Sequence, residues 1–242
     1  SGLPQVAYFH WLMGCLPDSL LAYKLLTFVS ITLSGTLVYL ICRELKFVNR
    51  TQGLFIALLS LSYPAYQVSV EMVMTPYSVC YCLFLAACFS ALRSEQAAGY
   101  RHCALRAIAW ILWFLSFTIN SLLVFFYGFF LILILLDVQK NGNSLTRLLT
   151  RFLPRHADYL VFPVVYWVLL RHFFPPHGLY SEYTELSLSP FAFIDFLART
   201  VFAGIVDPLA DLVRHPAILV PILLATLIAS WVFDLKRFRF LS

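Results

Sequence analysis

The sequence predicts an all-α, polytopic integral membrane protein with about seven transmembrane helices and with interfacial helices on its outer face. The first reason is composition: 61% of the 242 residues are hydrophobic and only 12% are charged, whereas a soluble domain carries roughly 25% charged residues. The second is that continuous apolar runs recur along the chain, each long enough to cross about 30 Å of hydrocarbon as a helix. These features exclude a water-soluble enzyme.

The apolar runs define the transmembrane elements, and Pro, Gly and charged residues mark their ends. The runs are continuously apolar and do not alternate in the way that barrel strands do, so we expect each to be a helix. The seven predicted spans lie near residues 23–42, 54–70, 76–92, 104–118, 121–137, 157–173 and 217–233.

Basic residues set the predicted topology, because loops rich in Lys and Arg favour the cytoplasmic side of a membrane. The runs 54–92 and 104–137 have basic residues at both ends, so we expect each to turn back as a hairpin. The predicted turns fall between Pro64 and Pro76 and within 118–121. This places residues 1–22 outside and puts the cytoplasmic segments at 43–53, 93–103, 138–156 and 234–242.

Two segments are predicted to lie on the outer surface instead of crossing the membrane. Residues 191–206 contain Asp195 and Arg199 and would reach only about 24 Å as a helix. Residues 1–22 are amphiphilic, carry Trp11 and are interrupted by Pro17. We therefore expect one domain over 1–242: an outer interfacial segment (1–22), six spans (23–173), an outer loop with an interfacial helix (174–216), and a last span with a cytoplasmic tail (217–242).

Several other functions are not supported by the sequence. The 17 basic residues exceed the 12 acidic ones by five, but in a membrane protein this excess reports loop orientation, so no nucleic-acid partner is needed. The six cysteines form no CxxC pair and are predicted to be packing residues, without a disulfide framework or metal site. His172 and His177 lack the spacing of a zinc pair; no metal site is predicted, and dependence on a divalent metal stays open.

The polar residues indicate where chemistry would occur. No ionisable residue lies near the middle of a predicted span, which argues against a proton-coupled carrier because buried charges mark ion pathways. Titratable side chains gather instead at the predicted outer face. An enzyme acting on a lipid-linked substrate would have its site there.

Three segments resemble the GT-C glycosyltransferases. The first contains His10-Trp11-Leu12 and Asp18-Ser19-Leu20-Leu21-Ala22-Tyr23-Lys24, and its span closes with Val38-Tyr39-Leu40-Ile41-Cys42-Arg43. The second is the hairpin with Ser62-Tyr63-Pro64, Glu71 and Thr75-Pro76. The third is Tyr166-Trp167-Val168-Leu169-Leu170-Arg171, followed by an outer loop with Pro and Gly that ends in Tyr180.

The resemblance implies sugar transfer from a polyprenyl-phosphate-linked donor to a cell-envelope glycan or lipid acceptor at the extracytoplasmic face. It also implies a location in a bacterial or archaeal plasma membrane with the active face outside. The acidic motif of the family's first outer loop has no match here, and no signal peptide is visible at Ser1. Two explanations are open: either the chain is part of a longer protein in which that motif precedes Ser1, or the resemblance is one of architecture alone.

Four residues are the candidate site. Glu71 is the predicted catalytic carboxylate, because transfer to a hydroxyl needs a proton acceptor as the sugar carbon becomes cationic. Arg171, His10 and Tyr180 are predicted to bind the donor, with the Arg171 guanidinium suited to a lipid phosphate. Each has a plainer explanation: a solvated loop carboxylate, a snorkelling arginine, an interfacial histidine and a belt tyrosine.

Two other functions remain open from the sequence. One is a translocator of lipid-linked substrates or a small-solute transporter, which a second, inverted half downstream would favour. The other is a non-catalytic membrane scaffold. A preceding span followed by an acidic outer loop would favour the glycosyltransferase.

Overall fold

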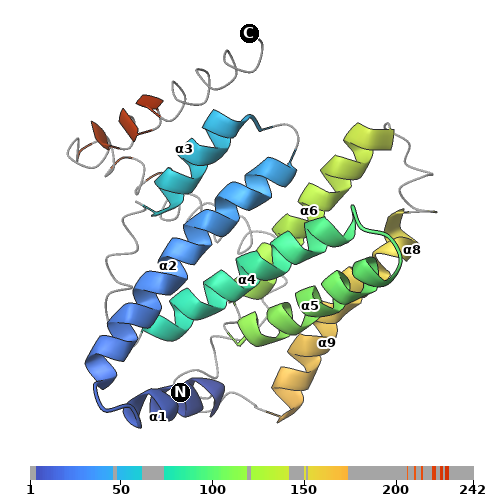
Figure 1. The fold of residues 1–242 in the computed structure, drawn as a ribbon. Helices are drawn as coiled ribbons and strands as arrows, with labels where there is room; N and C mark the ends of the chain where they lie inside the picture. The colour runs from blue at the N-terminus through green and yellow to red at the C-terminus, as the bar shows by residue number, and fades with distance from the viewer. Residues whose placement is uncertain are drawn as a thin grey trace.

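The computed structural model describes residues 4–45, 48–61, 74–118, 121–141, 150 and 152–173, and isolated positions between 206 and 228. Every regular element in these ranges is a helix, as predicted (Figure 1). The helices are α1 (Pro4–Gly14), α2 (Ser19–Glu44), α3 (Arg50–Leu61), α4 (Thr75–Ser94), α5 (Tyr100–Ser116), α6 (Ser121–Asn141), α8 (Leu153–Arg155) and α9 (Ala157–Phe173).

Most of the predicted spans coincide with helices. Five of them correspond to α2, α4, α5, α6 and α9, and α3 covers the first part of 54–70. The predicted turn after Pro64, the interfacial helix over 191–206 and most of the last span lie outside the described residues. Of 217–233, only 220, 221, 224, 225, 227 and 228 are described, and each is helical.

Two helices begin earlier than predicted because a polar side chain caps them. The Asp18 carboxylate accepts a hydrogen bond from the Leu21 amide at 3.1 Å, so α2 starts at Ser19 and not at 23. Residues 19–22 therefore belong to α2 and not to the surface segment. At α3, the side chains of Asn49 and Gln52 accept hydrogen bonds from each other's amides at 2.8 and 3.0 Å. This reciprocal capping box starts the helix at Arg50.

The helices alternate in direction. Ring contacts pair Phe117 with Phe126 and Trp113 with Phe129, so the order on α6 reverses that on α5. This confirms that the 104–137 run breaks and turns back, between Ser116 and Ser121. Thr27, in the third turn of α2, meets Thr75 at the start of α4, and the last turns of the two helices meet at Glu44 and Arg93. These two helices are therefore parallel.

This alternation gives the bundle two ends, which we name by what lies there. The α1 end contains α1, the first turns of α2 and α4, and the last turns of α5 and α9; the loop end contains residues 45, 48 and 49 and segments 95–99 and 152–156 (Figure 1). The parts of 43–53, 93–103 and 138–156 that the structure describes meet at the loop end through ion pairs. Which side of a membrane that end faces stays a prediction.

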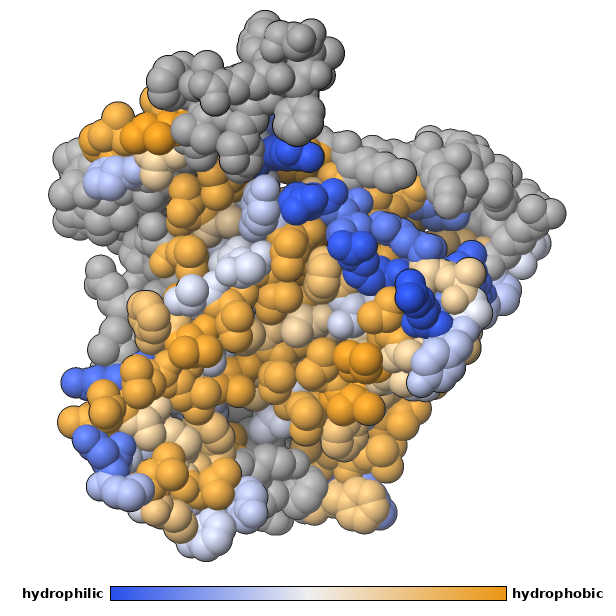
Figure 2. Space-filling view, in the orientation of Figure 1, coloured by the Kyte–Doolittle hydropathy of each residue, from blue (hydrophilic) through white to orange (hydrophobic). Residues whose placement is uncertain are grey.

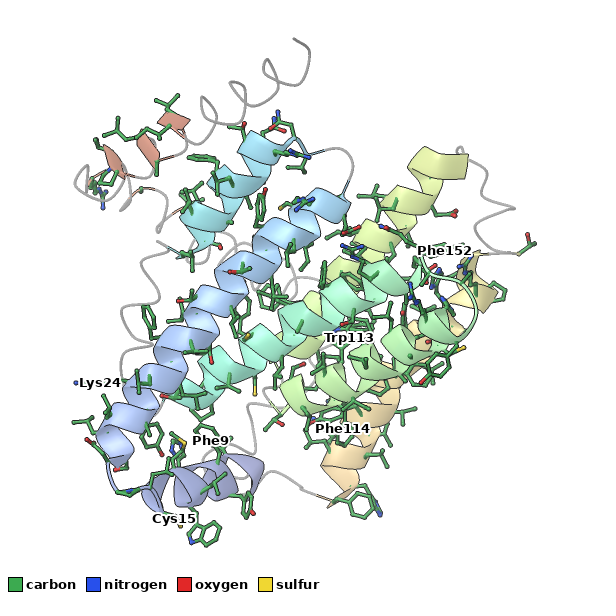
Figure 3. The ribbon with its side chains drawn as sticks, in the orientation of Figure 1. Phe9, Cys15, Lys24, Trp113, Phe114 and Phe152 are labelled. Atoms are coloured by element: carbon green, nitrogen blue, oxygen red, sulfur yellow. The ribbon has the colours of Figure 1, made fainter. Side chains whose placement is uncertain are left out.

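The core is aromatic and is centred on Trp113 of α5, which is fully buried (Figure 3). Its ring lies 4.7 Å from that of Phe126 on α6 and 5.3 Å from that of Tyr159 on α9. Such edge-to-face pairs add to the free energy gained from burial alone. The Trp113 cluster therefore holds α5, α6 and α9 together.

Small residues hold α2 against its neighbours. A Cβ added at Gly35 would come within 2.5 Å of the Leu61 side chain, and one added at Gly53 within 3.1 Å of Cys42. The absence of a side chain at these glycines lets α3 approach α2 closely, as small residues do in membrane helix packing.

Large apolar side chains cover much of the outside of the bundle. Phe28 of α2 is 69% exposed, Leu131 of α6 59% and Val168 of α9 52%. Figure 2 shows this apolar surface over the middle of the visible face, with hydrophilic residues gathered mainly toward the loop end. By length and composition, two described helices, α2 and α4, can cross a membrane; α3 and Phe125–Val138 are apolar but shorter.

Candidate functional site

His10 is held at the α1 end by a hydrogen bond to α2. Its Nδ1 lies 2.7 Å from the hydroxyl of Tyr23, a residue that is 7% exposed. The Phe9 ring meets the rings of His10 and Tyr23 edge to face, at 5.7 and 6.2 Å. Figure 3 shows Phe9 in the angle between α1 and α2. The contact fixes the imidazole while leaving part of His10 exposed.

The same face of α2 also holds the start of α4. Tyr23 and Thr27 are four residues apart and so lie on one face of the helix. The Thr27 hydroxyl is 2.9 Å from that of Thr75, and both threonines are buried. Glu71 precedes Thr75 by four residues and lies outside the described residues. One face of α2 thus joins α1, with His10, to the point where the Glu71 segment enters α4.

Arg171 lies in the last turn of α9. Its Cζ sits 4.5 Å from the centre of the Trp167 ring one turn earlier, a cation–π contact. Tyr166 packs edge to face on Phe117 and Phe114 near the end of α5, at 5.4 Å each. These contacts place Arg171 at the α1 end, on a different helix from His10. Tyr180 lies outside the described residues.

A second polar cluster, which the sequence did not predict as a unit, lies at the loop end. Arg106 of α5 forms two hydrogen bonds with the Asp158 carboxylate of α9 and donates a third to the Arg155 carbonyl at 2.9 Å. Arg155 pairs with Glu95 at 3.0 Å. The Arg106 guanidinium also lies 4.6 Å from the centre of the Tyr159 ring. The cluster joins α4, α5, α8 and α9.

His156 is the buried member of this loop-end cluster. Its ring stacks against Tyr159 at 5.5 Å, and Phe152 lies 4.4 Å away. Its Nδ1 is 3.8 Å from Oε1 of Glu95, and neither atom has a hydrogen-bond partner among the described residues. Burial lowers the pKa of His156, an effect that Arg106 and Arg155 reinforce and Glu95 and Asp158 oppose. The imidazole is therefore neutral at pH 7.

The loop-end cluster has a structural role, because its charged side chains form ion pairs with one another. Glu44 likewise pairs with Arg93 at 3.0 Å and accepts a hydrogen bond from Gln96 at 2.7 Å. A sequence signal existed: Arg106 and Asp158 are the third and second residues of two spans predicted to start on the same side. Charges at equal depth in the membrane can pair.

The cysteines and possible metal ligands are also accounted for within the described residues. All six cysteines are described and are free thiols; Cys42, Cys80 and Cys88 are buried, whereas Cys15 and Cys103 are exposed. The described ranges contain no group of three His, Cys, Asp or Glu side chains arranged to hold a metal ion.

Comparisons with protein-family models, with curated proteins and with solved structures found no match.

Proposed function

We propose that the chain forms part of the membrane domain of a GT-C-type glycosyltransferase, with seven transmembrane spans and with the segment that precedes α2 outside. The enzyme takes a sugar from a polyprenyl-phosphate-linked donor and transfers it to a cell-envelope glycan or lipid acceptor. The active face is the extracytoplasmic side of a bacterial or archaeal plasma membrane, and the α1 end is that face.

The exposed apolar side chains support the membrane part of this proposal. Leu25, Phe28 and Leu33 on α2, together with Leu131 on α6 and Val168 on α9, are at least half exposed. A soluble monomer rarely exposes so much contiguous apolar surface, whereas lipid would cover it. Exposed arginines at the loop end, such as Arg43 and Arg101, favour the cytoplasmic side for that end.

One observation carries the catalytic part of the proposal: the α2 face formed by Tyr23 and Thr27. Tyr23 holds His10, and Thr27 holds Thr75. Four residues of chain between Thr75 and Glu71 span at most about 14 Å. This length of chain allows the Glu71 carboxylate to reach the α1 end, where His10 lies. Arg171 ends α9 at the same end of the bundle.

The proposed roles follow from the chemistry of glycosyl transfer. As the bond from the sugar C1 to the donor phosphate oxygen breaks and a bond from C1 to the acceptor oxygen forms, the acceptor hydroxyl loses its proton. Glu71 accepts that proton. Arg171 offsets the negative charge that develops on the departing phosphate. His10 and Tyr180 offer hydrogen bonds to the donor. No metal is assigned a role.

The test is donor binding and sugar transfer by the full-length protein in liposomes. Arg171→Ala should weaken binding of a polyprenyl-phosphate sugar by about 1.5–3 kcal/mol, and Arg171→Lys should weaken it less, because lysine keeps the charge but loses the guanidinium fork. Glu71→Gln should bind the donor normally but turn over slowly. Arg101→Ala, at the loop end, is the matched control and should behave as wild type. Wild-type kinetics in both Arg171→Ala and Glu71→Gln would contradict the proposal.

A further inference from the structure

The hydrogen bond between His10 and Tyr23 has a direction that the surroundings decide. A neutral imidazole has one nitrogen that donates and one that accepts, and a phenol can do either. Two arrangements are therefore possible: the Tyr23 hydroxyl donates to Nδ1, or an Nδ1–H donates to the phenol oxygen. In the first arrangement a neutral His10 carries its proton on Nε2, and in the second it carries its proton on Nδ1.

Burial of Tyr23 favours the first arrangement. A buried phenol hydroxyl usually needs an acceptor for its proton. Within the described residues, Nδ1 of His10 is the sole hydrogen-bond partner of the Tyr23 hydroxyl. If Nδ1 carried a proton, the phenol proton would have no acceptor there, which costs about 1–3 kcal/mol for a buried group. The phenol therefore donates, and Nδ1 accepts.

The consequence falls on the other ring nitrogen. With Nδ1 unprotonated, a neutral His10 carries its proton on Nε2, which becomes a hydrogen-bond donor. His10 is partly exposed, and no described residue accepts a hydrogen bond from Nε2. The Asp18 carboxylate, which follows α1, already accepts from the Leu21 amide as the cap of α2. His10 thus keeps one fixed N–H for a ligand oxygen at the α1 end.

We propose that Tyr23 is a positioning residue that fixes His10 as an Nε2–H donor to a phosphate oxygen of the lipid-linked substrate. The phosphate half of this inference rests on the proposed function, whereas the tautomer does not. Phosphate oxygens are strong acceptors. A single oriented N–H next to a buried anchor would fix the position of the headgroup.

The tautomer is tested by ¹⁵N NMR of histidine-labelled full-length protein in detergent at pH 8, with the His10 signals assigned by their loss in His10→Asn. We expect Nδ1 of His10 to be unprotonated and Nε2 to be protonated. In Tyr23→Phe the two tautomers should mix. A protonated Nδ1 in the wild type would overturn the inference, whether or not the proposed function is correct.

Ligand binding is tested with a polyprenyl phosphate, with the phosphate-free polyprenol and inorganic phosphate as separate probes. In His10→Gln the amide nitrogen occupies the place of Nε2, so this variant should bind the polyprenyl phosphate within about threefold of wild type. In His10→Asn the amide reaches only the position of Nδ1, so affinity should fall about tenfold. The affinity of Tyr23→Phe for the polyprenyl phosphate should lie between those of His10→Gln and His10→Asn. Equal weakening for the polyprenol would indicate that His10 contacts the chain and would overturn the phosphate contact.

Two further outcomes separate this inference from the proposed function. If the wild type does not bind the polyprenyl phosphate but has the predicted tautomer, the proposed function and the phosphate contact fail together, and the positioning by Tyr23 stands. If the wild type binds and His10→Asn binds equally well, the phosphate contact fails while the function stands. Binding of inorganic phosphate with the same dependence on His10 would assign the site to free phosphate and overturn the lipid headgroup. Thermal unfolding of each variant checks that α1 remains packed.

Discussion

The hydroxyls of Thr27 and Thr75, 48 residues apart in sequence, lie 2.9 Å from each other in a buried contact between α2 and α4. The contact fixes the first turn of α4 against the helix that also carries Tyr23. It thereby sets where the chain that contains Glu71 enters the bundle.

Removing one hydroxyl of this pair should cost more than removing both. Thr27→Val leaves the buried Thr75 hydroxyl without its partner, so the free energy of unfolding should fall by about 1–2 kcal/mol. The double change to valine leaves no unpaired group and should recover most of this loss. Thr36→Val is the control, because the Thr36 hydroxyl bonds within its own helix and is exposed. Additive losses in thermal unfolding of the double variant would contradict a direct bond.

The close approach of α3 to α2 should depend on Gly35. In Gly35→Ala the new Cβ would come within 2.5 Å of Leu61, so we expect a destabilisation of about 1–3 kcal/mol from overpacking. Gly128→Ala, in a helix with nothing within 4 Å, should be neutral or stabilising. Adding Leu61→Ala to Gly35→Ala should relieve the clash. Unfolding in detergent compares the four proteins, and equal effects at the two glycines would refute this account.

Two ion pairs at the loop end should differ in strength because they differ in exposure. The Arg106 and Asp158 side chains are 15% and 23% exposed, whereas Arg93, which pairs with Glu44, is 50% exposed. Arg106→Ala should therefore lower stability by about 1.5–3 kcal/mol, and Arg93→Ala by less than about 1 kcal/mol. Arg106→Lys should also lose most of the stability that Arg106 provides, since lysine cannot form the forked contact. In thermal unfolding, high salt should reduce the difference in stability between the wild type and Arg93→Ala, and should leave the difference between the wild type and Arg106→Ala unchanged.

These contacts also show what the sequence could and could not predict. Span positions and the 104–137 hairpin were accessible because apolar length and flanking charge are local properties. The pairing of Arg106 with Asp158 joins residues 52 apart; the predicted spans put the two side chains at a similar depth, but nothing in the sequence shows that α5 and α9 are neighbours. The helices that begin at Ser19 and Arg50 start four residues before the predicted spans, because the side chains of Asp18 and Asn49 cap them and apolar length alone does not locate a cap. At the candidate site, the sequence proposed His10 but gave no sign that Tyr23 would anchor it.

Acid should destabilise the protein partly through His156. Burial depresses the folded-state pKa of His156 below its usual value near 6.5. The unfolded chain therefore binds the proton more tightly, and the stability present above pH 6.5 is lost as the pH falls from 6.5 through the folded-state pKa. His156→Gln removes this titration. Between pH 7.5 and pH 5, the wild type should lose more thermal stability than the variant, and parallel curves would show that His156 does not contribute.

The exposed cysteines at opposite ends of the bundle test whether it spans the membrane. Cys15 lies in the turn between α1 and α2, and Cys103 lies in the first turn of α5, so α2, α3 and α4 separate them. Because α2 and α4 are parallel, both can cross only if the chain between them returns through the membrane, and the two thiols then lie on opposite sides. Thiols on the same side would mean that the bundle does not span the membrane between its two ends.

Labelling with a membrane-impermeant maleimide distinguishes these two topologies. The four other cysteines, at 42, 80, 82 and 88, are replaced by alanine, and Cys103 or Cys15 is then replaced in turn, so that each variant keeps one thiol. We expect Cys15 to react in intact cells and Cys103 to react only after the membrane is opened, because basic residues place the loop end in the cytoplasm. Reaction of both thiols in intact cells would mean that the parallel helices α2 and α4 do not span the membrane between the α1 end and the loop end. The assignment of the α1 end to the extracytoplasmic face, and with it an extracytoplasmic role for the Glu71 carboxylate, would then be ruled out.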